Sequence, residues 1–418
     1  MKILFQNIRQ LIQVRETSSF ILKGAAMKEL PLIENAFLLV EDSFISGFGK
    51  MEEVPAIAFD EVVDCSGKIL LPTWIDTHTH LVFAQHREQE FVDRINGLNY
   101  QEIAAKGGGI LNSAKKLQEA TEEDLYQNAA KRLQQIIQSG TGALEIKTGY
   151  GLELEAEIKM LRVIERLRKN FSIPIKITFL GAHAIPESYQ GNQDAFVEDL
   201  LQKYFPEVHA LGLVDYFDAF LETGYFSVNN TQRLIQEAKK YGWKSKIHVN
   251  QFTAIGGIAM CAEEEVLTVD HLEIITSEDI IALKSSNTIP VALPICSFFI
   301  GIPYTPTKQI LQNDLPLVIA SDYNPGTSPS ANMHFAMALG CIQMKLTPEE
   351  SINACTYNAA FAMELEKEIG SFTVGKKANF IVTKPLKQYY EIPYLFGENI
   401  VDQVWIDGGK LKFDDTVY

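Results

Sequence analysis

Short apolar runs of strand length recur through the middle of the chain, and most are separated by segments with helical periodicity. In segments such as 156–169 and 231–241, apolar residues recur every three to four positions, as in an amphipathic helix. The runs that we predict as strands are 69–76, 143–147, 176–180, 216–222, 245–249, 266–270, 290–294 and 317–321. Eight strands that alternate with helices predict an α/β fold, a closed (β/α)₈ TIM barrel with its helices outside.

The two ends of the chain have a different pattern, of short strands joined by turns. Residues 36–40 and 44–48 flank a polar turn and predict a β-hairpin. Near the other end, segments 369–382 and 401–406 have the same texture, with glycine turns beside apolar residues. We therefore predict one small β-sandwich-like domain built from both termini, residues 1–68 and 362–418, beside a barrel of residues 69–361.

The segment Asp76-Thr77-His78-Thr79-His80 carries the strongest chemical signal. Alternate residues of a strand share a face, so both imidazoles can reach one metal ion. On its own, such a pair is equally typical of a half-buried surface strand. Three further apolar runs end in a residue of ligand type, namely His248, His271 and Asp322. A TIM barrel builds its catalytic site from such groups, because the C-terminal ends of its strands meet at one face.

Composition and charge are those of a globular protein. At 418 residues the chain exceeds a barrel of about 250 residues, which leaves room for a modest second domain. The hydrophobic fraction of 46% argues against extended disorder. The net charge of -16 disfavours nucleic acid and anionic membranes as partners, and no apolar span approaches membrane length. Five cysteines without a CxxC spacing are interpreted as reduced core residues. We expect a soluble, cytoplasmic protein.

Several motifs resemble the amidohydrolase superfamily of metal-dependent hydrolases. They are the HxH pair, the ligand-type residues that close the fifth, sixth and eighth strands, and the stretches GGGI (107–110), EIKTGYGL (145–152), FLGAHA (179–184), DHLE (270–273) and SDYNPGTS (321–328). The match runs in order from Ile69 to Ala378. The resemblance implies a hydrolase, expected as a homodimer, that uses one divalent ion, zinc or iron, to open a small cyclic amide with a carboxylate tail.

The resemblance also implies roles for the residues at the strand ends. The metal ligands would be His78, His80, His248 and Asp322, and the ion would lower the pKa of a water molecule. Asp322 would also take the proton from that water and pass it to the leaving nitrogen. We place His271 outside the ligand set, where it orients the water or polarises the carbonyl; a hydrogen-bonded core histidine is the alternative.

The number of ions follows from the fourth strand. Binuclear members of the superfamily bridge two ions with a carboxylated lysine there, whereas segment 217–222 contains no lysine. A single ion is therefore predicted. Lys147 ends the second strand, and we interpret it as a structural ion pair with a carboxylate such as Glu145 rather than as a nucleophile.

Arg87, just past the first strand, is our candidate for binding the carboxylate tail, because a guanidinium group grips a carboxylate with two parallel hydrogen bonds. Its alternative is an exposed salt bridge with Glu88 or Glu90. The resemblance adds substrate or product contacts at Tyr150, His183, Gln251, Asn324, Gly326, Thr327 and Tyr100. The alternatives for these residues are packing at strand ends and, for 324–327, an ordinary turn.

Two other functions remain open from the sequence. A purine or pyrimidine aminohydrolase would keep the metal site but would not need a tail-binding arginine such as Arg87. A non-catalytic scaffold on the same fold should have lost metal ligands, and all four are present in the sequence.

Overall fold

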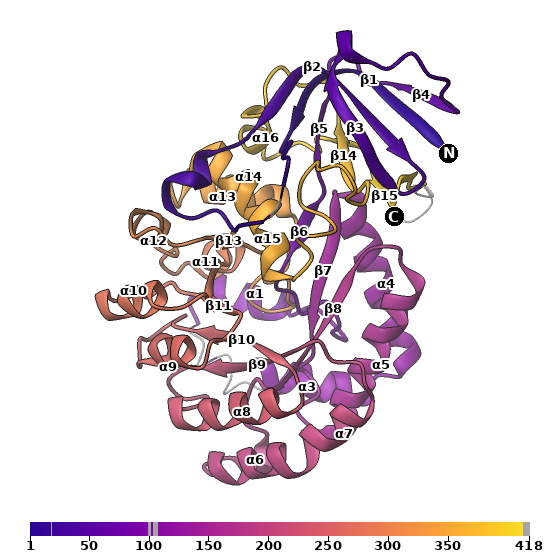
Figure 1. The fold of residues 1–418 in the computed structure, drawn as a ribbon. Coiled ribbons are helices and arrows are strands. Elements are labelled where there is room, and N and C mark those ends of the chain that lie inside the picture. The colour runs from indigo at the N-terminus through magenta and orange to yellow at the C-terminus, as the bar shows by residue number, and fades with distance from the viewer. Residues whose placement is uncertain (18, 99–101, 103–107, 413–418) are drawn as a thin grey trace.

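Eight parallel strands in the middle of the chain form the sheet of a barrel (Figure 1). The computed structural model describes residues 1–17, 19–98, 102 and 108–412. Each strand pairs in parallel with the next along the chain. The strands are β6 (Trp74–Asp76), β7 (Thr141–Lys147), β8 (Ile175–Ala182), β9 (Tyr216–Leu221), β10 (Lys244–Val249), β11 (Thr268–His271), β12 (Ile289–Ala292) and β13 (Val318–Ile319). The predicted (β/α)₈ barrel is confirmed.

The barrel closes between its first and last strands through contacts at their C-terminal ends. Thr79 and Tyr323 form an isolated parallel bridge. The backbone N–H of His80 donates to the carbonyl of Tyr323 (2.8 Å), and that of Asp322 donates to the carbonyl of His78 (3.0 Å). The segments that carry three of the predicted ligands are thus hydrogen-bonded directly to each other.

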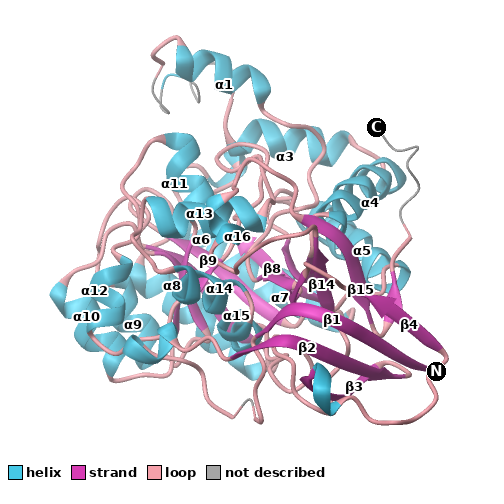
Figure 2. Cartoon of the chain, turned by 90° about the horizontal axis from the view of Figure 1, so that it is seen from above, coloured by secondary structure: helices cyan, strands magenta, loops and turns pink. Residues whose placement is uncertain are grey.

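Helices surround the strands of the barrel on the outside (Figure 2). Those with the most regular apolar stripe, such as α4, turn Leu125, Ala129, Leu133 and Ile136 toward the sheet. The helices are α1 (Glu88–Ile95), α3 (Ile110–Glu119), α4 (Glu122–Gln138), α5 (Leu154–Asn170), α6 (Gln193–Asp199), α7 (Phe205–Ala210), α8 (Val228–Lys240), α9 (Gly257–Glu263), α10 (Ser277–Lys284), α11 (Pro294–Ile300), α12 (Thr307–Gln312), α13 (Met333–Ile342), α14 (Pro348–Cys355), α15 (Tyr357–Ala362) and α16 (Glu391–Tyr394). Within the described part of the chain, no helix combines the length and apolar character needed to cross a membrane.

Both termini contribute to a second sheet, which lies at one end of the molecule in Figure 1. Its strands are β1 (Lys2–Ile12), β2 (Leu32–Glu41), β3 (Phe44–Lys50), β4 (Glu61–Asp64), β5 (Ile69–Pro72), β14 (Phe380–Thr383), β15 (Val401–Ile406) and β16 (Gly409–Lys410). The predicted hairpin is the antiparallel pair of β2 and β3. The aromatic rings of Phe5, Phe380 and Trp405 pack together in the core of this domain.

One predicted strand is divided between the two sheets. We predicted a single barrel strand over 69–76, but β5 pairs with β1 and β14 of the terminal sheet, and only β6 joins the barrel. Thr73 lies between the two strands, where its backbone N–H donates to the carbonyl of Asn379 (3.3 Å). All five cysteines are free, and all but Cys341 are fully buried, in agreement with their interpretation as reduced core residues.

Candidate metal centre and substrate cavity

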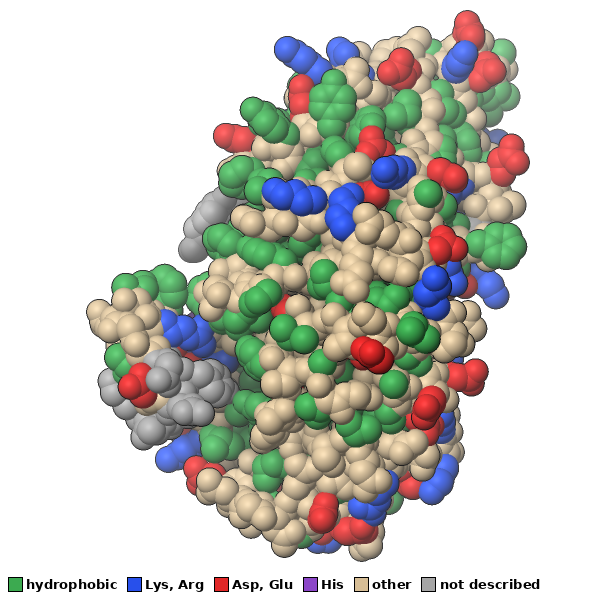
Figure 3. All heavy atoms as spheres, turned by 90° about the vertical axis from the view of Figure 1, so that its left-hand side faces the viewer, with side chains coloured by type: hydrophobic (Ala, Val, Ile, Leu, Met, Phe, Trp, Pro, Cys, Tyr) green, Lys and Arg blue, Asp and Glu red, His purple; other side chains and the backbone are tan. Residues whose placement is uncertain are grey.

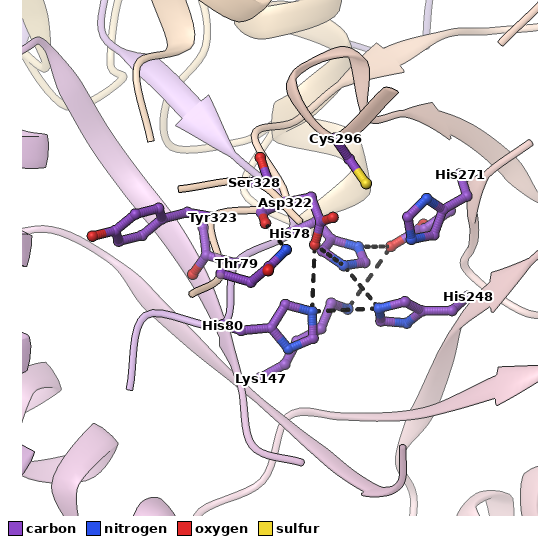
Figure 4. A network of polar contacts seen from close by, with 12 residues as sticks. His78, Thr79, His80, Lys147, His248, His271, Cys296, Asp322, Tyr323 and Ser328 are labelled. Carbon is purple, nitrogen blue, oxygen red and sulfur yellow. Dashed lines mark hydrogen bonds and ion pairs between the residues drawn. The ribbon is translucent and has the colours of Figure 1, made fainter. Parts of the chain in front are cut away.

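The structure brings the four predicted ligands together at the C-terminal ends of the barrel strands. His78 and His80 follow β6, His248 lies in β10, and Asp322 follows β13. One ligand atom from each residue lies within 4.8 Å of the others, and all four side chains are buried. Figure 4 shows these side chains pointing toward one another. This arrangement could hold one ion with three nitrogen ligands and one oxygen ligand.

Hydrogen bonds to carboxylates orient two of the imidazoles. His78 contacts Asp270 Oδ2 through Nδ1 (2.6 Å), and His248 contacts Asp218 Oδ2 through Nδ1 (2.8 Å). An ionised carboxylate only accepts hydrogen bonds, so each Nδ1 carries the proton and each Nε2 presents its lone pair. Burial lowers the pKa of both imidazoles well below the usual value, which keeps them neutral.

The distances between the ligand atoms fit a cation. The Nε2 atoms of His78 and His248 are 3.1 Å apart, although both are acceptors and repel each other at that separation. Asp322 Oδ1 is 3.5 Å from Nε2 of His78 and of His80. Ligands about 2.1 Å from a tetrahedral zinc ion are about 3.4 Å apart. The donor set and its spacing therefore suit a divalent ion, which would also remove the repulsion.

His271 lies beside this cluster without belonging to it. Its ring centroid is 5.4 Å from that of His248 and 6.0 Å from that of His78. Nδ1 is 3.3 Å from Glu273 Oε1, and the backbone has a positive φ of 90°. Such a backbone conformation is costly for a residue with a side chain, and it is tolerated mainly where function requires it. Asp322 has φ 56°, and burial raises its pKa to about 6.

A cavity of about 740 Å³ opens onto the cluster. Of the predicted substrate contacts, Arg87, Tyr150, His183, Gln251, Asn324 and Thr327 line it. Gly326 is absent from the lining, and Tyr100 lies outside the described residues. Residues that the sequence did not indicate also line the cavity, including Arg94, Phe220, Tyr225 and Ile302. Six of the eight predicted contacts therefore surround one space beside the four-residue cluster.

Arg87 is buried at the cavity wall rather than exposed. Its side chain retains 7% of its exposure, and Nη1 is 3.7 Å from Glu90 Oε2. Among the described residues Nε has no hydrogen-bond partner. A buried guanidinium N–H without a partner is costly, so a bound carboxylate would satisfy it. The alternative of an exposed salt bridge does not match this burial.

Gly326 supports Arg87 instead of lining the cavity. A Cβ atom built on Gly326 would lie only 1.3 Å from Arg87 Nη2, so any larger side chain would displace the guanidinium group. Asn324 forms the turn that was the alternative interpretation of 324–327, because its Oδ1 accepts from the backbone N–H groups of Gly326 (2.9 Å) and Thr327 (2.7 Å). The turn thus holds the surface on which Arg87 packs.

His183 and Tyr150 form another part of the cavity wall, next to His80. The rings of His183 and His80 stack with centroids 5.2 Å apart, and Nδ1 of His183 is 3.0 Å from the carbonyl of Gly149. Burial lowers the pKa of His183 to about 4, so this imidazole is neutral near pH 7. Because the Gly149 carbonyl can only accept, Nδ1 carries the proton and donates to it, and Nε2 is left as an acceptor for a polar ring.

The face drawn in Figure 3 shows acidic and basic side chains interspersed rather than gathered by sign. A nucleic-acid-binding surface would instead show a continuous basic patch, which this face lacks.

Sequence reasoning missed the residues that support the site. Asp218 and Asp270 orient the imidazoles, and Cys296 accepts a hydrogen bond from Gln251 Nε2 (3.5 Å). The available signal was a set of acidic residues inside otherwise apolar strand segments. Arg94 had no such signal, because its position depends on the loop at 324–327, where its Nη1 donates to the carbonyl of Gly326 (3.1 Å).

Comparison with known proteins gives a consistent result. A model of the amidohydrolase family matches residues 69–411. An imidazolonepropionase from Flavobacterium psychrophilum is 55% identical over 408 residues, which cover 98% of this chain and 99% of that protein. An imidazolonepropionase from Christiangramia forsetii is 53% identical with the same coverage.

Solved structures with much lower identity share the fold. A triazine hydrolase variant has a TM-score of 0.76 at 13% identity, covering 98% of this chain and 94% of that one. Guanine deaminase from E. coli has a TM-score of 0.71 at 15% identity, covering 99% and 100%. An adenosine deaminase from Xanthomonas campestris with bound zinc has a TM-score of 0.70 at 13% identity, covering 98% and 92%.

Proposed function

The chain belongs to the amidohydrolase family and, within it, to the imidazolonepropionases, and we propose that it hydrolyses 4-imidazolone-5-propanoate to N-formimidoyl-L-glutamate. This reaction is a step of histidine degradation. The observation that carries the proposal is the buried Arg87 guanidinium group in the wall of the cavity that opens onto His80, His248 and Asp322. One cavity can thus bind a carboxylate tail while a cyclic amide lies at the metal centre.

The proposed cofactor is one divalent ion, zinc or iron, held by His78, His80, His248 and Asp322. When bound, it would lower the pKa of a water molecule toward neutrality and polarise the amide carbonyl. Imidazole and carboxylate ligands suit both metals. The zinc bound by the adenosine deaminase of similar fold supports the choice of a divalent ion. No second ion is proposed, since β9 carries Asp218 and no lysine.

The protein's own groups then perform the proton transfers. Asp322 takes a proton from the attacking water as the oxygen bonds to the amide carbon. The carbon–nitrogen bond of the ring breaks, and Asp322 returns the proton to the departing nitrogen. His271, held by Glu273 (3.3 Å), stabilises the charge that develops on the carbonyl oxygen. The neutral His183 and the amide of Gln251 are proposed to bind the ring.

The reaction can be tested with freshly prepared 4-imidazolone-5-propanoate and purified protein of measured metal content. We expect one ion per chain, loss of the imidazolone absorbance, and N-formimidoyl-L-glutamate as the product in mass spectrometry. Guanine and adenine serve as comparison substrates, because deamination would release ammonia. Ammonia release from a nucleobase without imidazolone turnover would contradict the proposal and favour an aminohydrolase.

The role of Arg87 gives a separate prediction. Arg87→Met should raise KM roughly 10- to 100-fold with little change in kcat, because it removes a charged hydrogen bond to the tail but leaves the metal centre intact. Gly326→Ala should also raise KM, because its methyl group would displace the guanidinium group. The control is 5-methyl-4-imidazolone, a substrate analogue without the carboxylate, on which wild type and both variants should act equally. An unchanged KM in Arg87→Met would rule out tail binding.

The homodimer expected from the resemblance stays a prediction. Sedimentation equilibrium of the metal-loaded protein would measure it directly.

A further inference from the structure

Five charged side chains are completely buried in the barrel next to the metal centre. They are Glu145 and Lys147 on β7, Asp218 on β9, Lys246 on β10 and Asp270 on β11, each with 0% exposure. None of them lines the cavity, and none belongs to the ligand cluster. Burial costs several kcal/mol for each charge unless its partners compensate. The network therefore has a role that neither substrate binding nor direct metal ligation explains.

Lys147 contacts the carboxylates that orient two ligands. Its Nζ is 2.9 Å from Asp218 Oδ2 and 3.8 Å from Asp270 Oδ2. The same two oxygen atoms accept hydrogen bonds from Nδ1 of His248 and of His78. Figure 4 shows Lys147 beside these imidazoles. One ammonium group therefore reaches both histidines through a single carboxylate each.

The two aspartates need a cation between them. Both carry negative charge in a region without solvent, where like charges repel strongly. Burial alone would lower the pKa of Lys147, but the carboxylates of Asp218, Glu145 and Asp270 raise it well above the usual value. The ammonium group thus stays charged and offsets the repulsion. Its N–H groups reach Glu145 (2.6 Å) and Asp218 (2.9 Å), while Asp270, at 3.8 Å, is attracted by charge without a hydrogen bond.

We propose that Lys147 is a positioning residue of the metal centre, whose ammonium group holds the carboxylates of Asp218 and Asp270 and thereby fixes the ligating orientation of His248 and His78. The inference rests on the proposed metal site but not on the identity of the substrate. It extends the prediction of a structural ion pair with Glu145, a contact of 2.6 Å in the structure.

Lys246 provides a matched control in the same network. It is buried to the same extent, and its Nζ contacts Glu145 and donates to the carbonyl of Thr77 (2.8 Å). Among the described residues it forms no ion pair with either aspartate within 4.0 Å. Lys246→Met therefore removes an equal buried charge without removing the contact with the aspartates.

The test measures the affinity for Zn²⁺ by competition with a chromogenic chelator. It uses the full-length protein after removal of bound metal, and the fold of each preparation is checked before the titration. Lys147→Met should bind Zn²⁺ about 10- to 100-fold more weakly than wild type, as expected when a group that orients metal ligands is lost. KM of the metal-saturated variant should change less than twofold, because Lys147 does not line the cavity. Lys246→Met should lose less than a third as much affinity. Equal losses in the two variants, or wild-type affinity in Lys147→Met, would overturn the proposal.

A second set of variants covers the case in which Lys147→Met does not fold. The double variant Asp218→Asn/Asp270→Asn lacks both aspartates, and the triple variant adds Lys147→Met. Of the five buried charges, the triple variant keeps only Lys246 and Glu145, which form an oppositely charged pair, so its buried charge is balanced. If Lys147 acts through the aspartates, the triple and double variants should have Zn²⁺ affinities within twofold of each other. A further tenfold loss in the triple variant would show that Lys147 acts by another route.

The readout also separates this inference from the proposed function. A protein that binds Zn²⁺ through Lys147-dependent histidines but does not consume 4-imidazolone-5-propanoate would contradict only the proposed substrate. A protein that turns over the substrate and whose Lys147→Met variant binds Zn²⁺ normally would contradict only the positioning role.

Discussion

In the proposed mechanism Asp322 combines metal ligation with proton transfer, and one substitution separates the two roles. Asp322→Asn keeps an oxygen ligand of similar shape but removes the base, so kcat should fall by about 10²- to 10⁴-fold while some metal is retained. Metal content and turnover of the same preparation, measured on 4-imidazolone-5-propanoate, test this prediction. Near-normal turnover of metal-loaded Asp322→Asn would contradict the proton relay.

His271 should behave differently, because it lies outside the four-residue cluster. We expect His271→Asn to retain the metal and to lower kcat less than Asp322→Asn does, with a smaller effect on KM, because a group that stabilises developing charge acts in the transition state. The same two measurements apply. Complete loss of metal from His271→Asn would place this histidine among the ligands.

At the scale of residues, the sequence shows which side chains lie at the end of a predicted strand. It predicts a functional role correctly only where that position alone decides the role. His78, His80, His248 and Asp322 could be proposed because a strand end in a barrel faces the site. The burial of Arg87 could not be predicted, since it depends on Gly326, 239 positions away along the chain. Such long-range packing leaves no local signal.

At the scale of elements, the turn between β7 and α5 places Tyr150 in the cavity wall. Glu157 of α5 accepts hydrogen bonds from the backbone N–H groups of Gly149 (3.1 Å), Gly151 (2.7 Å) and Leu152 (3.0 Å). The side chain is fully buried. One carboxylate therefore fixes the conformation of the segment that carries Tyr150.

Glu157→Gln should loosen this turn, because its amide N–H₂ would face N–H donors in place of an acceptor. Leaving such buried groups unpaired costs about 1–3 kcal/mol, so we expect a lower unfolding free energy and a severalfold higher KM. Zn²⁺ affinity should stay unchanged. Glu153→Gln, at an exposed position of the same turn, is the control. Unaltered KM and stability in Glu157→Gln would show that the turn does not depend on this carboxylate.

The hydrophobic pattern predicted the barrel strands well, because each is an apolar run bounded by polar turns. The hydrophobic pattern could not divide the run at 69–76 into two strands. All residues of β5 and β6 are buried, so the sequence there has the pattern of one continuous buried strand. Which sheet a buried strand joins depends on its neighbours. Here those neighbours are β14, which comes some 300 residues later, and β7.

At the scale of the whole molecule, buried amide groups join the terminal segments to the barrel helices. Gln13 Nε2 donates to Asn353 Oδ1 (2.6 Å) in α14, and Asn353 Nδ2 donates to the carbonyls of Met27 (2.9 Å) and Glu29 (3.0 Å). Asn358 in α15 forms two hydrogen bonds with the backbone of Leu22: its Oδ1 accepts from the N–H group (3.0 Å), and its Nδ2 donates to the carbonyl (2.9 Å). Buried amides without these partners would be costly, so we expect the two parts to unfold together.

Lys376 offers a test of that cooperativity, because it lies in the segment that connects α15 of the barrel with β14 of the terminal sheet. If the two parts unfold together, its protonation should affect the unfolding of the whole chain. Its Nζ donates to the carbonyl of Ile369 (2.9 Å) and to Ser371 Oγ (2.8 Å). Burial lowers the pKa of Lys376 to about 8. The charge of Glu366 raises this pKa and that of Arg15 lowers it, and both effects are smaller than that of burial. In the unfolded chain the pKa returns to its usual value near 10.5.

The sign of the pH effect follows from these two values. Below pH 8 both states hold the proton, and between pH 8 and 10.5 the unfolded chain holds more protons than the folded one, so the unfolding free energy rises with pH across this window. For this single group the rise is on the order of 2–3 kcal/mol. Urea unfolding of wild type and Lys376→Met at several pH values measures it, and the difference between the two proteins removes the contributions of other groups. If the barrel and the terminal sheet unfold together, the far-UV and near-UV circular dichroism signals will give the same change in unfolding free energy with pH. A change in only one of two unfolding transitions would show that the two parts unfold separately. Equal pH profiles for the two proteins would exclude a lowered Lys376 pKa.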